Sequence, residues 1–263
     1  MSPIDSLNPM WRKRLLAELL AFCLTAWNGI ALGQQTIINV PSDTLTPEGR
    51  HFLLHESAMT PNAAPDATFS STNFYCYGLS KHTELTLTLY NVTDVGSENL
   101  CINPGFKSVR GVFQDQLPDP AIKLTYGFAA PISLQHATPS VGYFPYTHFS
   151  SNLFGTKLRL LGGVAAGSRN FFGKDAVSAL AGLEFPITEH LSFTGEWFSG
   201  NHLLSALIPG FTYHREDLIV VAGYKFSNDF DPDKSGVVLE IGYFFGGPSP
   251  DKFAPPEHYG IFR

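Results

Sequence analysis

Glu84-Leu85-Thr86-Leu87-Thr88-Leu89 is the stretch of this sequence that decides the fold, because polar and leucine side chains alternate strictly along it. Successive side chains of a β-strand point to opposite faces, so all the leucines of this stretch share one face and the polar side chains share the other. A helix would mix the two kinds on each face. The stretch therefore predicts a strand with one apolar face and one polar face.

The same alternation recurs along most of the chain and predicts an all-β protein of about twelve strands. The expected strands are 50–57, 69–79, 83–92, 100–115, 121–130, 141–149, 156–166, 176–186, 191–199, 204–213, 218–226 and 236–245. The alternation is weakest in the first of these strands and in the sixth, which contains Pro145. Without these two the count falls to ten.

The faces opposite the apolar ones carry mostly Ser, Thr, Gly and Ala with isolated charges. Such a face suits the interior of a narrow barrel better than the water-exposed side of a soluble sandwich. Four acidic and four basic side chains are predicted to face this lumen: Glu84, Lys123, Lys157, Arg159, Glu184, Glu196, Lys225 and Glu240. Their balance predicts a neutralised interior rather than a strongly ion-selective pore.

The connections between the expected strands alternate in length, which is a second and independent signal. The short ones are 80–82, the region around Pro118-Asp119-Pro120, 150–155, 187–190 and 214–217. The longer ones, 58–68, 93–99, 131–140, 167–175 and 227–235, are rich in Pro, Asp, Asn, Ser and Gly. Transmembrane barrels show short periplasmic turns and longer outer loops, so an antiparallel up-and-down transmembrane β-barrel is predicted.

The N-terminal 33 residues have the parts of a secretory signal peptide. The positive region Trp11-Arg12-Lys13-Arg14 precedes a mostly apolar run and the small-residue site Ala31-Leu32-Gly33. We expect cleavage after Gly33 and export to the bacterial outer membrane; an uncleaved N-terminal anchor is the alternative. The remaining chain then divides into a periplasmic N-terminal segment (34–49), the barrel (50–245) and an extended C-terminal tail (246–263).

Composition narrows the range of partners. Charged residues make up only 15% of the chain, against the usual quarter, so something other than water is expected to cover part of the surface. The chain has a net charge of -6, so it lacks the excess of Lys and Arg that neutralises a phosphate backbone. Nucleic acid is therefore excluded as an expected partner.

Three turn-flanked stretches make the chain resemble the small Gram-negative outer-membrane β-barrel proteins, which include porin-like and transporter-like members. They are Tyr77-Gly78-Leu79-Ser80-Lys81-His82-Thr83-Glu84-Leu85, Phe185-Pro186-Ile187-Thr188-Glu189-His190-Leu191 and Glu240-Ile241-Gly242-Tyr243-Phe244-Phe245. The last looks like the barrel-assembly signal of that class, although here residues 246–263 follow the final aromatic. The resemblance implies outer-membrane lipid and the barrel-assembly machinery as partners, with small solutes as candidate cargo.

His148-Phe149-Ser150 is similar to the His-x-Ser arrangement of outer-membrane lipid A deacylases, in which His activates a Ser hydroxyl. Those enzymes also need a carboxylate to orient the His, and no Asp or Glu lies close downstream of Ser150. We therefore predict that the protein is not an enzyme, and a lipid hydrolase that uses His148 and Ser150 stays as an alternative. No metal or other cofactor is predicted.

Cys76 and Cys101 are the two cysteines of the expected mature chain. An even pair in an oxidising compartment is a candidate disulfide, and two free thiols are the alternative.

The predicted function follows from location more than from a site. We expect an integral outer-membrane barrel that acts as a narrow pore or transport-related channel for small solutes, or as a structural surface protein. The competing class is a secreted soluble β-sandwich that serves as a binding module, with the apolar faces forming its core.

Overall fold

A computed structural model of the chain describes residues 40–60, 68–90, 101–112, 122–134, 140–153, 156–169, 176–202 and 204–247. The expected signal peptide (1–33) and almost all of the expected C-terminal tail lie outside these residues.

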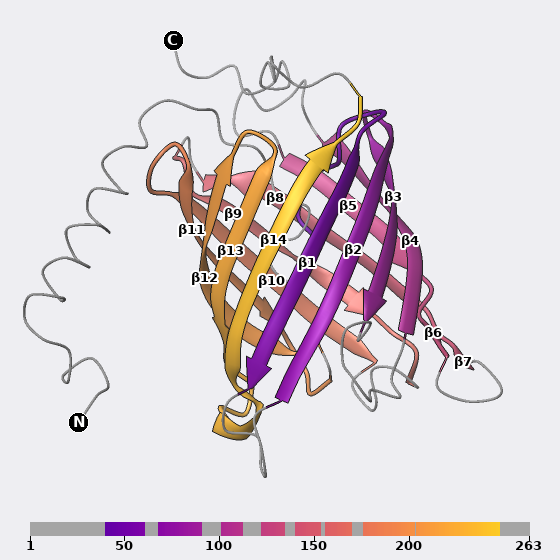
Figure 1. Ribbon diagram of the computed structural model, residues 1–263, viewed down its shortest axis with the longest axis vertical. Helices are drawn as coiled ribbons and strands as arrows, with labels where there is room; N and C mark the ends of the chain where they lie inside the picture. The colour runs from indigo at the N-terminus through magenta and orange to yellow at the C-terminus, as the bar shows by residue number, and fades with distance from the viewer. Residues whose placement is uncertain are drawn as a thin grey trace, which may run out of the picture.

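Twelve long strands form the wall of a barrel, in which each strand runs antiparallel to its neighbours (Figure 1). They are β1 (His51–Thr60), β2 (Thr68–Ser80), β3 (Thr83–Tyr90), β4 (Cys101–Val112), β5 (Ile122–Ala129), β8 (Phe144–Asn152), β9 (Arg159–Ala166), β10 (Val177–Pro186), β11 (Leu191–Phe198), β12 (Ala206–Arg215), β13 (Leu218–Lys225) and β14 (Gly236–Phe245). All twelve lie where the alternation predicts them, including the two weakest.

The first and last strands pair with each other, which places the two ends of the wall side by side. Residues 51–59 of β1 pair with 237–245 of β14, and β3 pairs with β4 to complete the ring. A closed ring leaves no unpaired strand edge, as a barrel in lipid requires. The prediction of an antiparallel barrel is thus confirmed, and the ten-strand alternative is wrong.

A short hairpin extends the wall where the sequence predicts only a loop. β6 (Ile132–Ser133) pairs with the start of β4, and β7 (Ser140–Val141) pairs with β6. Pro131 has no backbone N–H for the ladder, so β5 ends before it and the pairing with β4 resumes as a separate strand.

The outward side chains form an apolar belt around the barrel. On β14 the exposed side chains are Val237, Leu239, Ile241, Tyr243 and Phe245, whereas those between them are buried in the barrel. Exposed Leu85, Phe128, Phe149, Phe185 and Phe211 continue the belt around other strands. An apolar outer face of this kind is the surface that a transmembrane barrel presents to lipid. No helix among the described residues is long and apolar enough to cross a membrane.

Short turns gather at one end of the barrel and longer connections at the other. Residues 81–82, 187–190 and 216–217 join strands at the short-turn end, where β1 begins and β14 ends. The stretches 130–143, 199–205 and 226–235 connect strands at the opposite end. This segregation is what the alternating connection lengths predict, and it identifies the short-turn end as the expected periplasmic side.

The lumen is not uniformly polar. One apolar cluster, around Phe52, Ile208, Ile219 and Val221, lines the wall formed by β1, β2 and β12–β14. A second, around Phe144, Leu161 and Phe198, lies on β5 and β8–β11 and includes Val40. Side chains therefore fill much of the interior, as is expected of a narrow barrel.

Candidate functional site

Residues 40–46 lie inside the barrel rather than in the periplasm, and 47–49 lead from them to the start of β1, with Glu48 and Gly49 exposed. Val40, Ser42 and Thr46 are fully buried, and Asp43 is only 4% exposed. We call residues 40–49 the plug. The predicted periplasmic segment (34–49) is thus corrected for residues 40–46, while 34–39 lie outside the described part of the chain. The physical reason is that polar, turn-forming residues find partners among the charged side chains of the lumen.

Asp43 ties the plug to three strands. Its carboxylate accepts a hydrogen bond of 2.8 Å from the Ser150 hydroxyl on β8 and lies 3.2 Å from the Lys123 ammonium on β5. Arg159 on β9 forms ion pairs with both Asp43 and Glu184. Burial alone would raise the pKa of the Asp43 carboxyl, but the charges of Arg159 and Lys123 and the Ser150 hydrogen bond hold that pKa below its usual range.

Two glutamates of the wall accept hydrogen bonds from the plug backbone. The Thr46 N–H donates to Glu84 Oε2 on β3 at 2.6 Å, and the Val40 N–H donates to Glu196 Oε2 on β11 at 2.7 Å. Glu84 also forms an ion pair with Lys107 on β4, with 3.0 Å between Oε1 and Nζ. Backbone donors without a strand partner are thereby satisfied by buried carboxylates, which are strong acceptors.

The C-terminal part of the plug lies against β2 at Gly78. Glu48 and Gly78 form an isolated parallel bridge, in which the Gly49 N–H donates to the Gly78 carbonyl at 2.8 Å. A Cβ at position 78 would lie only 2.0 Å from the Pro47 carbonyl oxygen. The close approach of the plug to the wall therefore requires glycine at this position.

Arg50 joins the end of the plug to the short-turn rim. Its guanidinium lies 2.9 Å from the Asp217 carboxylate in the β12–β13 turn, and its Nε donates to the Gly246 carbonyl at 3.0 Å. The start of β1 and the end of β14 are thereby held together at the rim.

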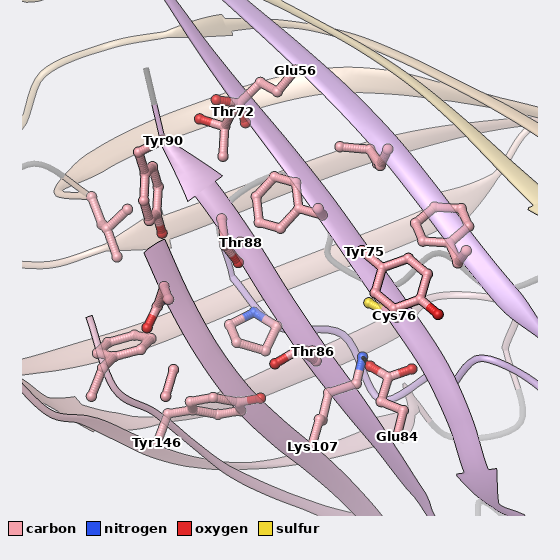
Figure 2. A pocket seen from close by; sticks show the side chains of 18 of the residues that line it. Glu56, Thr72, Tyr75, Cys76, Glu84, Thr86, Thr88, Tyr90, Lys107 and Tyr146 are labelled. Carbon is pink, nitrogen blue, oxygen red and sulfur yellow. Dashed lines mark ion pairs between the residues drawn. The ribbon is translucent and has the colours of Figure 1, made fainter. Parts of the chain in front are cut away.

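A cavity of about 180 Å³ lies beside Pro41 of the plug, and we call it the chamber. Phe52, Leu54 and Phe74 form its apolar side, whereas Thr88, Tyr90 and Asn103 contribute polar groups. Figure 2 shows Glu56, Thr72 and Tyr90 toward one end and the Lys107–Glu84 ion pair toward the other. The lumen thus holds both the plug and a small space of mixed polarity.

The structure places most of the predicted lumen charges inside the barrel. Glu84, Lys123, Arg159, Glu184, Glu196, Lys225 and Glu240 are on inward-facing strand positions. Lys157 is the exception: β9 begins at Arg159, so Lys157 lies in the preceding bend and is exposed. The predicted pairing of lumen charges is seen between Arg159 and Glu184. These residues lie on β9 and β10, which are neighbouring strands.

Sequence reasoning missed four charged residues of the lumen, which are Asp43, Arg50, Glu56 and Lys107. The two strand residues could have been found by parity, because Glu56 shares a strand face with Phe52 and Leu54, and Lys107 shares one with Asn103. On β1, however, the inward face is the more apolar one, and Pro104 interrupts the pattern on β4. No local pattern marks Asp43, since its role depends on partners that are 80 or more residues away in the sequence.

His148 and Ser150 both point into the lumen, where the plug covers them. The Ser150 hydroxyl donates to Asp43, and neither ring nitrogen of His148 hydrogen-bonds to Ser150. The plug thus supplies a carboxylate, that of Asp43. This carboxylate accepts a hydrogen bond from Ser150, whereas a catalytic triad would use it to orient His148. Acyl chains of surrounding lipid contact the outer face of the barrel, so this geometry does not support the lipid-hydrolase alternative.

Cys76 and Cys101 are free thiols, so the candidate disulfide is wrong. Thr86 on β3 pairs with both Cys76 on β2 and Gly105 on β4. Cys101 therefore lies four residues along β4 from the level of Cys76, roughly 13 Å at about 3.3 Å per residue. A disulfide needs Cα atoms within about 7 Å.

Comparison with solved structures finds barrels of the same kind. The KdgM porin in complex with disordered oligogalacturonate matches at a TM-score of 0.51 and 8% identity, over 76% of this chain and 99% of the porin. Two further matches are Omp33 of Acinetobacter baumannii (TM-score 0.44, 10% identity, 76% and 100% coverage) and an outer membrane channel from Pseudomonas putida F1 (0.40, 12%, 82% and 100%). No protein-family model and no curated protein sequence matches the chain.

At such low identity the likeness to the porin is one of fold. It agrees with the closed ring, the apolar belt and the segregated connections. A soluble sandwich would not combine these three features. The chain therefore has the fold of the small outer-membrane β-barrel proteins.

Proposed function

We propose that the protein is an outer-membrane channel for small solutes that the plug holds closed. The apolar belt supports residence in a bilayer, and the charged lumen with its chamber supports passage of a polar or partly polar solute. The porin fold of the first structural match is consistent with this role.

The observation that carries the proposal is the way in which the plug is held. Side-chain contacts with β3, β5, β8, β9 and β11 retain it, while its described backbone forms isolated bridges rather than a strand, among them the bridge of Glu48 with Gly78. The plug contributes no strand to the ring, so it can leave the lumen without breaking the hydrogen bonds that close the barrel. A segment with these properties is suited to closing and opening a pore.

The test is single-channel conductance of the refolded mature chain (34–263) in planar bilayers. We expect the wild-type protein to be closed most of the time, with rare brief openings, and an Asp43→Ala variant to open more often because the plug loses its ion pairs. A wild-type barrel that inserts but never conducts, together with an equally silent Asp43→Ala variant, would overturn the channel.

A structural role is the second candidate, and the two apolar clusters favour it. They fill much of the lumen with Phe, Ile, Leu and Val side chains, which narrows any path beside the plug. The same experiment separates the two roles, because a purely structural barrel stays silent in both proteins.

We also propose that the chain reaches the outer membrane after removal of residues 1–33 and insertion by the barrel-assembly machinery. The apolar run and small-residue site in the sequence and the aromatic end of β14 support this route. Mass determination of the protein isolated from outer membranes tests it, since cleavage after Gly33 predicts a mature N-terminus at Gln34.

A further inference from the structure

Carboxylates outnumber basic groups in the middle of the lumen. Glu56 and Glu240 are paired residues of β1 and β14, both point inward, and their exposed fractions are 8% and 0%. Lys225 on β13 is the basic side chain whose charge acts on Glu56, and it also acts on Glu196 of β11. Three acidic groups, Glu56, Glu196 and Glu240, thus surround one basic group, Lys225.

Glu56 and Lys225 of this cluster line the chamber together with the Lys107–Glu84 ion pair, and the chamber also presents hydrogen-bond acceptors. Glu56 and Asn103 both line it, each is only 8% exposed, and Glu56 Oε2 and Asn103 Oδ1 have no hydrogen-bond partner among the described residues. Hydroxyls of Thr72, Thr88 and Tyr90 lie around the same space, as Figure 2 shows. Burying an acceptor without a donor is costly, so a ligand that enters this space is favoured when it donates hydrogen bonds.

The other side of the chamber is apolar. Leu54 and Ala58 on β1 and Phe74 on β2 contribute hydrocarbon or aromatic surface. A cavity of about 180 Å³ is somewhat larger than the roughly 150 Å³ that holds a benzene ring, so it has room for an apolar body of about six carbon atoms. The favoured ligand therefore has a short apolar body as well as a donating, positively charged head.

We propose that the chamber binds a small protonated primary amine with a short alkyl body. Its ammonium group carries one positive charge and three N–H donors, which match the excess of acidic groups around Glu56 and the unpartnered acceptors of Glu56 and Asn103. A neutral alcohol would supply one donor and no charge. An alkali ion would leave the apolar side without a partner. The proposal deepens the proposed function, on which it rests, by naming the class of solute.

The experiment is equilibrium dialysis of labelled n-butylammonium against the refolded mature protein in detergent micelles at constant ionic strength. We expect saturable binding of one molecule per barrel and at least tenfold weaker binding to a Glu56→Gln variant, which keeps the shape and removes the charge. Glu216→Gln is the matched control, because it removes an exposed carboxylate from the β12–β13 turn and should bind as the wild type does.

A comparison of ligands on the wild-type protein needs no variant to fold. Butan-1-ol has the same body without the charge, and sodium has the charge without the body, so neither should displace n-butylammonium at equal concentration. Displacement by either one, or undiminished binding to Glu56→Gln, would overturn the proposal.

Dialysis and conductance separate this inference from the proposed function. Amine binding by a barrel that never conducts would overturn the channel and leave the binding site standing. Conductance without saturable amine binding would leave the channel standing and overturn the amine site.

Discussion

A single carboxylate shows how the lumen works at the scale of residues. Asp43 is buried, and a buried charge is tolerated only where counter-charges and hydrogen-bond donors surround it. Lys123, Arg159 and Ser150 supply them from three different strands. Asp43 thereby connects the plug to three of the twelve strands of the wall.

The first prediction concerns the substitution Asp43→Asn. Losing hydrogen-bonded ion pairs should weaken retention of the plug by about 1–3 kcal/mol. Cys76 can report this change, because its thiol lies against Thr46 of the plug. In a Cys101→Ser background, we expect a water-soluble thiol reagent to label Cys76 about tenfold faster, since 1.4 kcal/mol corresponds to a factor of ten. Equal labelling rates in the two proteins would show that Asp43 does not hold the plug.

The second prediction concerns pH. The pKa of Asp43 is depressed in the folded protein, so its stabilising contribution is complete above its unfolded pKa of about 3.9 and is lost only as pH falls through the depressed value. The closed fraction in conductance records should therefore stay constant between pH 5 and 8. Opening on acidification to pH 5.5 would show that a titratable group other than Asp43 controls the plug.

At the scale of elements, alternation on each strand assigns one face to lipid and the other to the lumen. β14 follows this rule at every position from Gly236 to Phe245. β1 follows it with Phe52 and Leu54 inside, because its lumen side belongs to an apolar cluster. Alternation with a period of two residues therefore separates the two faces of a strand. The polarity of a face does not by itself say whether that face is inside the barrel.

The third prediction uses the contact between β2 and the plug. Gly78→Ala would place a methyl group 2.0 Å from the Pro47 carbonyl oxygen, so residues 46–48 must move away from β2. Faster thiol labelling of Cys76 is the expected result. Gly162→Ala is the control, because a Cβ there meets its nearest atom only at 4.0 Å and should leave labelling unchanged. Similar rates in both variants would contradict a plug packed on Gly78.

The fourth prediction tests the lipid-facing belt. An arginine on the lipid face of a barrel costs about 2–4 kcal/mol near the bilayer midplane and about 0–1 kcal/mol near the interface. Leu239→Arg in the middle of β14 should therefore lower the free energy of unfolding by the larger amount, and Leu218→Arg at the rim by the smaller. Urea unfolding in lipid vesicles measures both. Equal costs at the two positions would argue against a membrane-embedded belt.

At the scale of the whole molecule, the ring and the plug have separate sources of stability. Backbone pairing from β1 around to β14 closes the wall, while side-chain contacts hold the plug. The first and last strands meet only when the whole barrel has formed, so the wall is expected to assemble cooperatively. Opening of the plug needs no such global change.

The fifth prediction belongs to this scale. A closed barrel in the membrane should stay with the membrane fraction after carbonate washing and should change its gel mobility on heating in detergent, because heat is needed to break the ring. Fractionation and paired heated and unheated gels measure this. A protein released by carbonate with unchanged mobility would favour the soluble β-sandwich.

Sequence by itself determined the strands, their approximate ends and the sorting of connections by length. These features are local: alternation over six to ten residues and turn-forming residues between them are enough to specify them. The same local patterns predicted the inward positions of Glu84, Glu184, Glu196 and Glu240. They failed at Lys157, where a shift of the strand start by three residues moved a side chain from the wall to a bend.

Only the tertiary structure decided where residues 40–49 lie and which groups meet in the lumen. The sequence of the plug is polar and rich in turn-forming residues, as in many surface segments. It lies in the barrel because strands that are distant in sequence converge on the Asp43 carboxylate and on backbone N–H groups of the plug. The chamber and its acidic neighbours likewise depend on closure, which brings Glu240 of the last strand beside Glu56 of the first. Closure of the ring is a property of the whole chain, so no local pattern specifies the contacts that it creates.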